Sequence, residues 1–260
     1  MIQNSFCILD GIGEKKERRL WKEGIVTWDD FLDADKLLTF SDERKRLFDE
    51  SLFLFQKEFD ARNAGYFSRE VKRREQWRLF ETFRDDTVCL DIETSGLQPQ
   101  SGGYVTVVGL YDGHDYKCFV HGRNLSTDIL NKELSNYKFL ITFYGAAFDI
   151  PFLQRTFPGI DFSMPHFDLC FGAKRLKIQG GLKKIEHDFG IERDESVQGL
   201  DGYDAVKMWE QSRAGSTQAL DRLIQYNRED TVNLMQIAPV LYERLKQSTG
   251  IEEYLACGVA

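Results

Sequence analysis

The chain has 260 residues, and its 42 acidic residues outnumber its 34 basic residues, so the formal net charge is −8. This length is too great for a mini-protein and allows one large domain or two modest ones, each with its own buried core. A hydrophobic content of 42%, an aromatic content of 13% and only five prolines exclude a disordered or fibrous protein. The acidic excess argues against a protein that coats nucleic acid through bulk positive charge, but it leaves open an enzyme whose active site is built from carboxylates.

The cysteines and the apolar segments indicate the compartment. The five cysteines are an odd number and form no C-x-x-C pair; they are Cys7, Cys89, Cys118, Cys170 and Cys257. This pattern predicts reduced intracellular thiols and favours neither a disulfide framework nor a zinc site. The first residues do not form a basic stretch followed by an apolar core, and no apolar run approaches 18 residues. We therefore expect a cytoplasmic protein with no membrane partner.

The first third of the chain has a helical pattern. Between residues 14 and 84 there is no proline, and apolar side chains recur at a spacing of three to four residues from Leu47 to Phe59. This predicts a helical N-terminal domain over residues 1–84. Its segment 62–84 holds seven basic and three acidic residues, which fits either an extension of a nucleic-acid path or an ordinary exposed basic helix.

A glycine turn precedes the first predicted helix. Gly11 and Gly13 permit a tight turn, helix-forming residues follow up to a stop at Gly24, and Thr27 is a candidate N-cap for the next helix. A glycine turn at a helix N-terminus presents free backbone N–H groups, which can hold a phosphate without reading its base. The alternative is that the glycines only connect two packed helices.

The stretch ILDGIGEKKERRLWKEGIVTWDDFL, within residues 5–35, resembles the helix-hairpin-helix DNA-binding module. Gly11 and Gly13 would lie in its hairpin. The resemblance implies non-specific backbone binding by Gly11, Gly13, Lys15 and Lys16. Helix-hairpin-helix units also serve in protein contacts, and a single unit would bind nucleic acid weakly.

At Thr87 the pattern changes to strands. TVCLDIE is a short apolar run, and YVTVVGLYDG followed by HDYKCFVHG predicts a hairpin that turns at Asp112 and Gly113. A helical stretch around residues 125–134, a further apolar run KFLITFYG and mostly helical sequence to about residue 245 come next. This order predicts an α/β domain with a mixed sheet over residues 85–250.

Carboxylates follow the predicted strands. Asp91 and Glu93 are two residues apart at the end of the first run, so in a strand both side chains leave the same face. Two such carboxylates repel each other unless they share a cation, and hard divalent ions such as Mg²⁺ prefer oxygen ligands. The alternative is a strand that simply ends in acidic, solvated residues.

Two further segments carry candidate site residues. Asp149 follows the run KFLITFYG among apolar neighbours, so it should be buried with a partner, face a cleft or cap its own helix. Tyr226 and Asp230 are four residues apart in a predicted helix, which places a phenol one turn from a carboxylate.

Together these segments resemble the tyrosine-type (DEDDy) DEDD exonucleases of the ribonuclease H-like superfamily. Asp91 and Glu93 match the first motif of that family, Asp149 the second, and Tyr226 with Asp230 the third. The stretches QWRLFETF and GLDGYDAVKMW are similar to a group of predicted bacterial and archaeal exonucleases. One position departs from the pattern: the asparagine that usually opens the second motif is replaced by Tyr144, at a place associated with substrate positioning. The resemblance implies a ribonuclease H-like mixed five-stranded sheet flanked by helices, preceded by a small helical domain.

The resemblance also implies a metal-dependent 3′–5′ exonuclease with two divalent ions, Mg²⁺ or Mn²⁺. Asp91 would bridge both ions, Glu93 and Asp230 would complete one site, and Asp149 would help to hold the second. Tyr226 would orient the attacking water, because a phenol with a pKa near 10 is a poor base. The expected partner is single-stranded DNA or a 3′ overhang, with RNA left open, and the protein is assumed to be a monomer. The alternatives are a catalytically weak module that binds or recruits nucleic acid and a structure-selective endonuclease on the same fold.

Overall fold

The computed structural model describes residues 1–255, so Cys257 lies outside the described residues. The chain forms two compact units, and each is described by itself. Unit 1 contains Met1–Arg84, Ser163–His166 and the chain from Tyr242 onward, whereas unit 2 contains Asp85–Phe162 and Phe167–Leu241.

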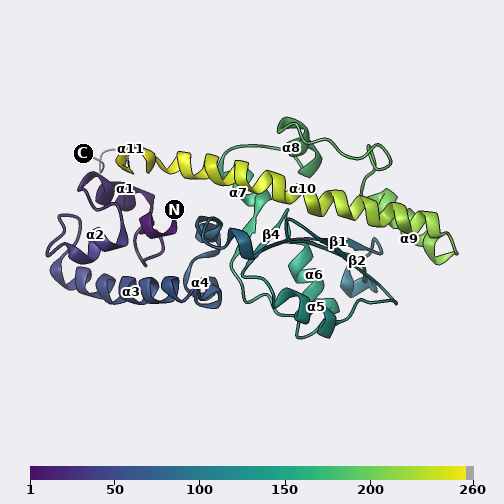
Figure 1. Ribbon diagram of the computed structural model, residues 1–260, viewed down its shortest axis with the longest axis horizontal. Coiled ribbons are helices and arrows are strands. Elements are labelled where there is room, and N and C mark those ends of the chain that lie inside the picture. Colours follow the sequence, from purple (N-terminus) through teal and green to yellow (C-terminus); the bar gives the residue numbers. More distant parts are fainter. Residues whose placement is uncertain (256–260) are drawn as a thin grey trace. The chain divides into compact units, whose positions relative to one another are not determined.

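Unit 1 is helical, as the sequence predicts. Its helical elements within the first 84 residues are η1 (Ile2–Asn4), α1 (Glu14–Lys22), α2 (Trp28–Asp33), α3 (Asp42–Asp60), α4 (Ala64–Glu70) and η2 (Arg73–Leu79). The short helix α11 (Glu252–Leu255) also belongs to this unit (Figure 1). Large aromatic side chains fill its core, and Trp21, Trp28 and Phe67 are almost fully buried. Burial of such rings supplies most of the stabilisation of a small helical unit.

The predicted helix boundaries in this unit are confirmed. Gly24 follows α1 with a φ of +85°, the left-handed conformation that glycine adopts without strain. Thr27 caps α2: its hydroxyl accepts the N–H of Asp30, and the Asp30 carboxylate accepts the N–H of Thr27. This reciprocal pair satisfies two N–H groups that the helix itself cannot use.

One of the seven basic residues in segment 62–84 is buried in unit 1. The Arg78 side chain has no exposed surface and pairs with Glu75 at 2.8 Å and with Glu17 at 3.1 Å. Glu17 also accepts hydrogen bonds from the backbone N–H groups of Phe6 and Cys7. Because two carboxylates surround this guanidinium in the core, Arg78 is a structural group and adds nothing to a nucleic-acid path.

Unit 2 is built around a mixed five-stranded sheet, and this fold class is confirmed. Its strands are β1 (Thr87–Thr94), β2 (Val105–Tyr111), β3 (Tyr116–Val120), β4 (Phe139–Thr142) and β5 (His166–Asp168), in the spatial order β3-β2-β1-β4-β5. The pairs β1–β2 and β2–β3 are antiparallel, and β1–β4 is parallel. The predicted hairpin at Asp112 and Gly113 joins β2 to β3, with Gly113 at a φ of +98°.

Helices cover both faces of this sheet (Figure 1). The helices that begin in this unit are α5 (Thr127–Leu134), α6 (Asp149–Thr156), α7 (Leu169–Arg175), α8 (Leu182–Asp188), α9 (Gly202–Arg213) and α10 (Thr217–Thr249). On one face α9 and the first part of α10 pack against β2 and β3 through a core that includes Val107, Trp209 and Leu223. On the other face lie α5 and α6. Among the described helices, none is both long enough and apolar enough to cross a membrane.

A glycine in the sheet allows α10 to approach β2 closely. Gly109 lies opposite Asp91 in the β1–β2 register. A Cβ atom at Gly109 would lie 2.1 Å from Oδ1 of Asn227 and 2.6 Å from Oγ1 of Thr231. Both distances are far below van der Waals contact, so only glycine permits this approach. The close packing brings the middle of α10 against the end of β1.

Candidate functional site

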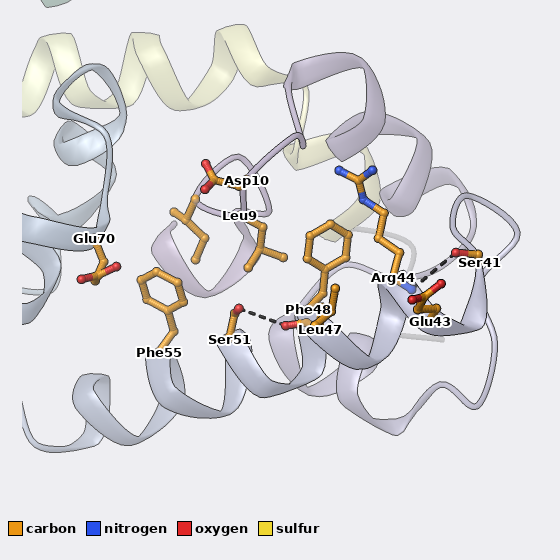
Figure 2. A pocket seen from close by; sticks show the side chains of 11 residues that line it. Leu9, Asp10, Ser41, Glu43, Arg44, Leu47, Phe48, Ser51, Phe55 and Glu70 are labelled. Atoms are coloured by element: carbon orange, nitrogen blue, oxygen red, sulfur yellow. Dashed lines mark hydrogen bonds between the residues drawn. The ribbon is translucent and has the colours of Figure 1, made fainter.

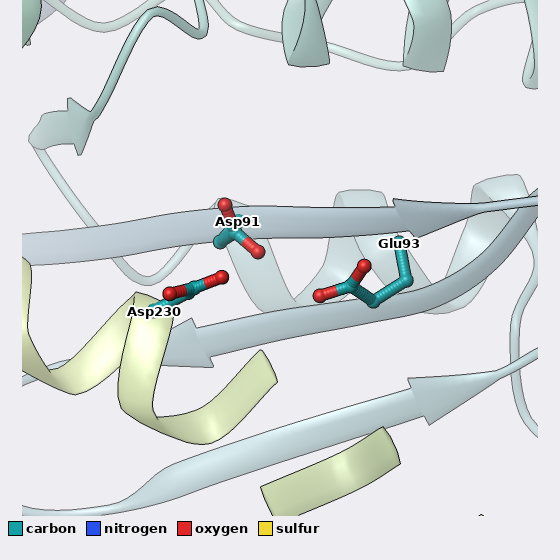
Figure 3. A group of neighbouring side chains, drawn as sticks. All are labelled: Asp91, Glu93 and Asp230. Atoms are coloured by element: carbon teal, nitrogen blue, oxygen red, sulfur yellow. The ribbon is translucent and has the colours of Figure 1, made fainter. Parts of the chain in front are cut away.

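Three carboxylates from β1 and α10 converge on one face of the sheet. Figure 3 shows Asp91 and Glu93 on the strand and Asp230 on the helix, with their carboxylates turned toward one another. One oxygen of each lies within 4.8 Å of those of the other two. The spacing of two residues along β1 places Asp91 and Glu93 on the same face, as predicted, and the register of α10 adds the third acid.

The carboxylates of the cluster are buried and repel one another. Burial raises the pKa of the Asp91 and Glu93 carboxyls well above their ordinary values, and the neighbouring acids, Asp230 first among them, raise both further. Burial also raises the pKa of Asp230. Oxygen Oε1 of Glu93 is buried and has no hydrogen-bond partner among the described residues. A cation would relieve the repulsion and satisfy this oxygen.

Asp149 is the fourth acid of the site. It is the first residue of α6, but the N-cap of that helix is Phe148, and no side chain caps it. The Asp149 carboxylate instead accepts the backbone N–H of Ile92 at 3.1 Å, next to Asp91 on β1. Burial raises the pKa of Asp149 to about 7. Of the predicted alternatives, capping of its own helix is therefore wrong, and burial with a partner is confirmed.

Asn227 holds Asp91 in place, and the sequence analysis missed it. Its Nδ2 donates to a carboxylate oxygen of Asp91 at 2.9 Å, and its Oδ1 accepts the hydroxyl of Tyr116 at 2.8 Å. Asn227 is fully buried against Gly109. The only sequence signal was its position three residues before Asp230, which places both side chains toward the same side of the helix.

Two basic side chains approach the third motif. Nζ of Lys183 donates to the Tyr226 hydroxyl at 3.3 Å and lies 5.0 Å from the centre of the Tyr226 ring. Arg193 pairs with Asp230 and, at 2.7 Å, with Glu186. Burial and the nearby acids raise the pKa of Tyr226, so this phenol stays protonated near neutral pH.

The predicted nucleic-acid-binding residues of the N-terminus lie together in unit 1. Gly11 has a φ of +78°, and Gly13 is the N-cap of α1. Lys15 is exposed in the first turn of that helix, whereas the Nζ of Lys16 donates to the Gly11 carbonyl at 2.9 Å. A 3₁₀ turn, Ile2–Asn4, precedes the glycines. Nucleic-acid binding by this segment stays a prediction, as does its likeness to a helix-hairpin-helix.

A pocket of about 610 Å³ lies in unit 1 and is lined in part by Ile8, Leu9 and Asp10, the residues just before Gly11 (Figure 2). Its apolar lining includes Leu9, Leu47, Phe48 and Phe55. Its charged lining residues are Asp10, Glu43, Glu70 and Arg44, which are three acids and one base. This balance disfavours a phosphate, so the pocket does not support nucleic-acid binding at the N-terminus.

The family of unit 2 follows from a comparison with known protein families. The model of the RNase_H superfamily matches residues 88–242, which is more than half of the chain. This chain belongs to the RNase H superfamily. The match spans all four acids described above, and it is consistent with the mixed sheet and its flanking helices.

Solved structures resemble this chain at low sequence identity. A family B DNA polymerase from Pyrobaculum calidifontis is 15% identical with a TM-score of 0.50, over 60% of this chain and 24% of the polymerase. NrnC from Brucella melitensis, solved with bound Mg²⁺ and bound to pGG, is 22% identical with a TM-score of 0.47, over 68% of this chain and 82% of NrnC. The EXO domain of Aedes aegypti Nibbler is 14% identical with a TM-score of 0.46, over 70% and 91%. No protein of curated function gave a match.

Proposed function

We propose that this protein is a metal-dependent 3′–5′ exonuclease that hydrolyses phosphodiester bonds of single-stranded nucleic acid. The observation that carries the proposal is the convergence of Asp91, Glu93 and Asp230, with Asp149 beside them, inside an RNase H superfamily domain. An acidic cluster whose pKa values are raised by burial and mutual repulsion is typical of a functional site.

The donor set fits divalent metal ions. All four side chains offer carboxylate oxygens, the ligands that Mg²⁺ and Mn²⁺ prefer, and one buried Glu93 oxygen has no hydrogen-bond partner within residues 1–255. Two ions would share Asp91 as a ligand. Glu93 and Asp230 would complete the site of one ion, and Asp149 would help to hold the other. Bound in this way, such ions supply activation of a water and stabilisation of the departing oxygen.

The neighbouring side chains support this arrangement. Asn227 fixes the orientation of Asp91 through a hydrogen bond to its carboxylate, as residues around metal ligands commonly do. Tyr226 keeps its proton and would orient the attacking water, and Lys183 donates a hydrogen bond to the phenol. A hydroxyl that positions water needs a fixed direction, which this contact provides.

Replacing Tyr226 with phenylalanine removes the hydroxyl and keeps the packing of the ring. We expect kcat to fall by about tenfold to a hundredfold while KM for a single-stranded substrate changes little, because the hydroxyl acts on water rather than on substrate binding. Single-turnover hydrolysis measured in Mg²⁺ checks this result. Tyr242→Phe, which removes a buried tyrosine hydroxyl from the same helix, is the matched control. An unchanged single-turnover rate in Tyr226→Phe would remove the role assigned to Tyr226.

The proposed substrate is a single-stranded DNA end or a 3′ overhang, with single-stranded RNA as a second substrate of the same chemistry. The experiment is incubation of DNA and RNA strands, labelled at either end, with the protein and Mg²⁺, Mn²⁺ or chelator. A 3′–5′ exonuclease shortens a 5′-labelled strand through a ladder of products and releases a labelled mononucleotide first from a 3′-labelled strand. Internal cuts would instead indicate an endonuclease, and binding without cleavage would indicate a recruitment module.

A further inference from the structure

An exposed aromatic pair follows strands β4 and β5 of the sheet. Tyr144, in the loop after β4, and Phe171, in α7, expose 46% and 47% of their surface. Their ring centres are 6.1 Å apart, and the Nζ of Lys174 lies 5.3 Å from the Tyr144 ring and 5.1 Å from the Phe171 ring. We call Tyr144, Phe171 and Lys174 the aromatic platform.

The backbone holds the Tyr144 ring at this place. Tyr144 has a φ of +66°, a conformation that a bulky residue adopts only when its surroundings impose it. The Asp168 carboxylate imposes it, because it accepts the N–H groups of Tyr144 and Ala146, each at 2.9 Å. The same carboxylate caps α7, which carries Phe171 and Lys174. The buried Asp168 carboxylate therefore fixes the backbone both at Tyr144 and at the start of α7.

The topology of the sheet places the platform at the edge where the carboxylates lie. β1 and β4 are parallel neighbours, with Cys89 paired to Ile141, so their carboxyl ends lie at the same edge. Asp91 follows Cys89 by two residues, and Tyr144 follows Ile141 by three. The loop that begins at Tyr144 then enters α6 at Asp149, which bonds to the backbone of β1.

We propose that the aromatic platform stacks a nucleobase of the bound strand and that Lys174 contacts an adjacent phosphate. This inference rests on the proposed function. Exposed aromatic faces beside a cation suit a nucleobase joined to a phosphate, because every base has a face for stacking and the backbone is anionic. An aromatic ring stacks bases of any identity, so the platform would bind a strand end without selecting its sequence.

The test uses Tyr144→Asn, because asparagine tolerates positive φ and removes only the ring. We expect the KM for a five-nucleotide DNA strand to rise about tenfold, since stacking of one base commonly accounts for such a factor. Hydrolysis of a strand of the same length built from abasic residues, which have no ring to stack, should stay unchanged. Tyr144→Phe should behave as wild type. Tyr203→Ala, which removes another exposed tyrosine that lies under a lysine, should have no effect.

Binding without hydrolysis separates this inference from the proposed function. A strand with 2-aminopurine at its 3′ end, titrated in Ca²⁺, should lose fluorescence on binding to wild type and bind Tyr144→Asn about tenfold more weakly. Equal affinity of the two proteins, or an equal loss of Tyr144→Asn activity on both substrates, would overturn the platform. If wild type quenches this strand but hydrolyses neither substrate in Mg²⁺ or Mn²⁺, the platform stands and the proposed exonuclease activity fails.

Discussion

Asp91→Asn and Asp230→Asn are each expected to lower hydrolysis of a single-stranded substrate by at least about a hundredfold. Each change keeps the shape of the side chain and removes one carboxylate from the cluster. A metal ion contributes several kcal/mol to stabilisation of the transition state, and each 1.36 kcal/mol is a tenfold change in rate. The initial rate in Mg²⁺, measured for each purified variant, checks this prediction.

The control is Asp221→Asn, an exposed aspartate on the same helix as Asp230 but two and a half turns away. It should keep the wild-type rate. The melting temperature of Asp91→Asn should equal or exceed that of the metal-free wild type, because the change removes a repelling charge, whereas Asp230→Asn also loses the ion pair with Arg193 and should melt at a lower temperature than Asp91→Asn. Full activity in both variants would contradict the assigned roles, and unfolding of either would show a structural requirement instead.

The second large effect is on stability as a function of pH. Burial raises the pKa of Asp149 from its ordinary value of 3.8 to about 7, and the pKa values of Asp91, Glu93 and Asp230 also rise. Above about pH 4, the folded protein therefore keeps protons on these carboxyl groups that the unfolded chain has released. The stabilisation that comes from binding these protons in the folded state is fully present below pH 4. It is lost as the pH rises through the pKa values of the folded protein, so the metal-free protein should be less stable at pH 8 than at pH 5.

Metal ions should reverse this loss. At pH 8, Mg²⁺ in excess should raise the melting temperature of the wild type by several degrees, since each 1 kcal/mol corresponds to roughly 2–4 °C for a domain of this size. Asp149→Asn should flatten the difference between pH 5 and pH 8 in the metal-free protein. Thermal unfolding of both proteins at the two pH values gives the answer. A wild type that loses no more stability from pH 5 to pH 8 than Asp149→Asn does would contradict the raised pKa of Asp149.

The sequence predicted those parts of the site that depend on local periodicity. Asp91 and Glu93 share a face because strand residues alternate, and Tyr226 and Asp230 share a face because a helix turns every 3.6 residues. The strands β1, β2 and β4 were visible as apolar runs. β5 has only three residues, too few for any pattern, and its presence came from the family resemblance alone.

The parts that were missed depend on distant segments coming together. The Asn227 amide bonds to Asp91, 136 positions earlier, and Gly109 matters only because a helix packs on it. No sequence pattern singles out Arg193, whose guanidinium pairs with Asp230 and Glu186 in the fold. Pairing across such separations is set by tertiary packing, which no local pattern records.

Net charge alone does not describe the local field at the carboxylate cluster. The value of −8 argued against a nucleic-acid partner, yet four of the acids gather where cations would reverse the local field. Two positive side chains lie over aromatic rings here: Lys183 over Tyr226 and Lys174 over Tyr144. The proposed binding of a strand to this part of unit 2 is therefore expected to weaken when metal is removed.

The measurement that tests the metal centre most directly is a titration of the metal-free protein with Mn²⁺, followed by electron paramagnetic resonance of the free ion. We predict two bound ions for the wild type and loss of both sites in Asp91→Asn, whereas Asp221→Asn binds as the wild type does. Equal Mn²⁺ binding by the wild type and Asp91→Asn would contradict a metal centre at this cluster.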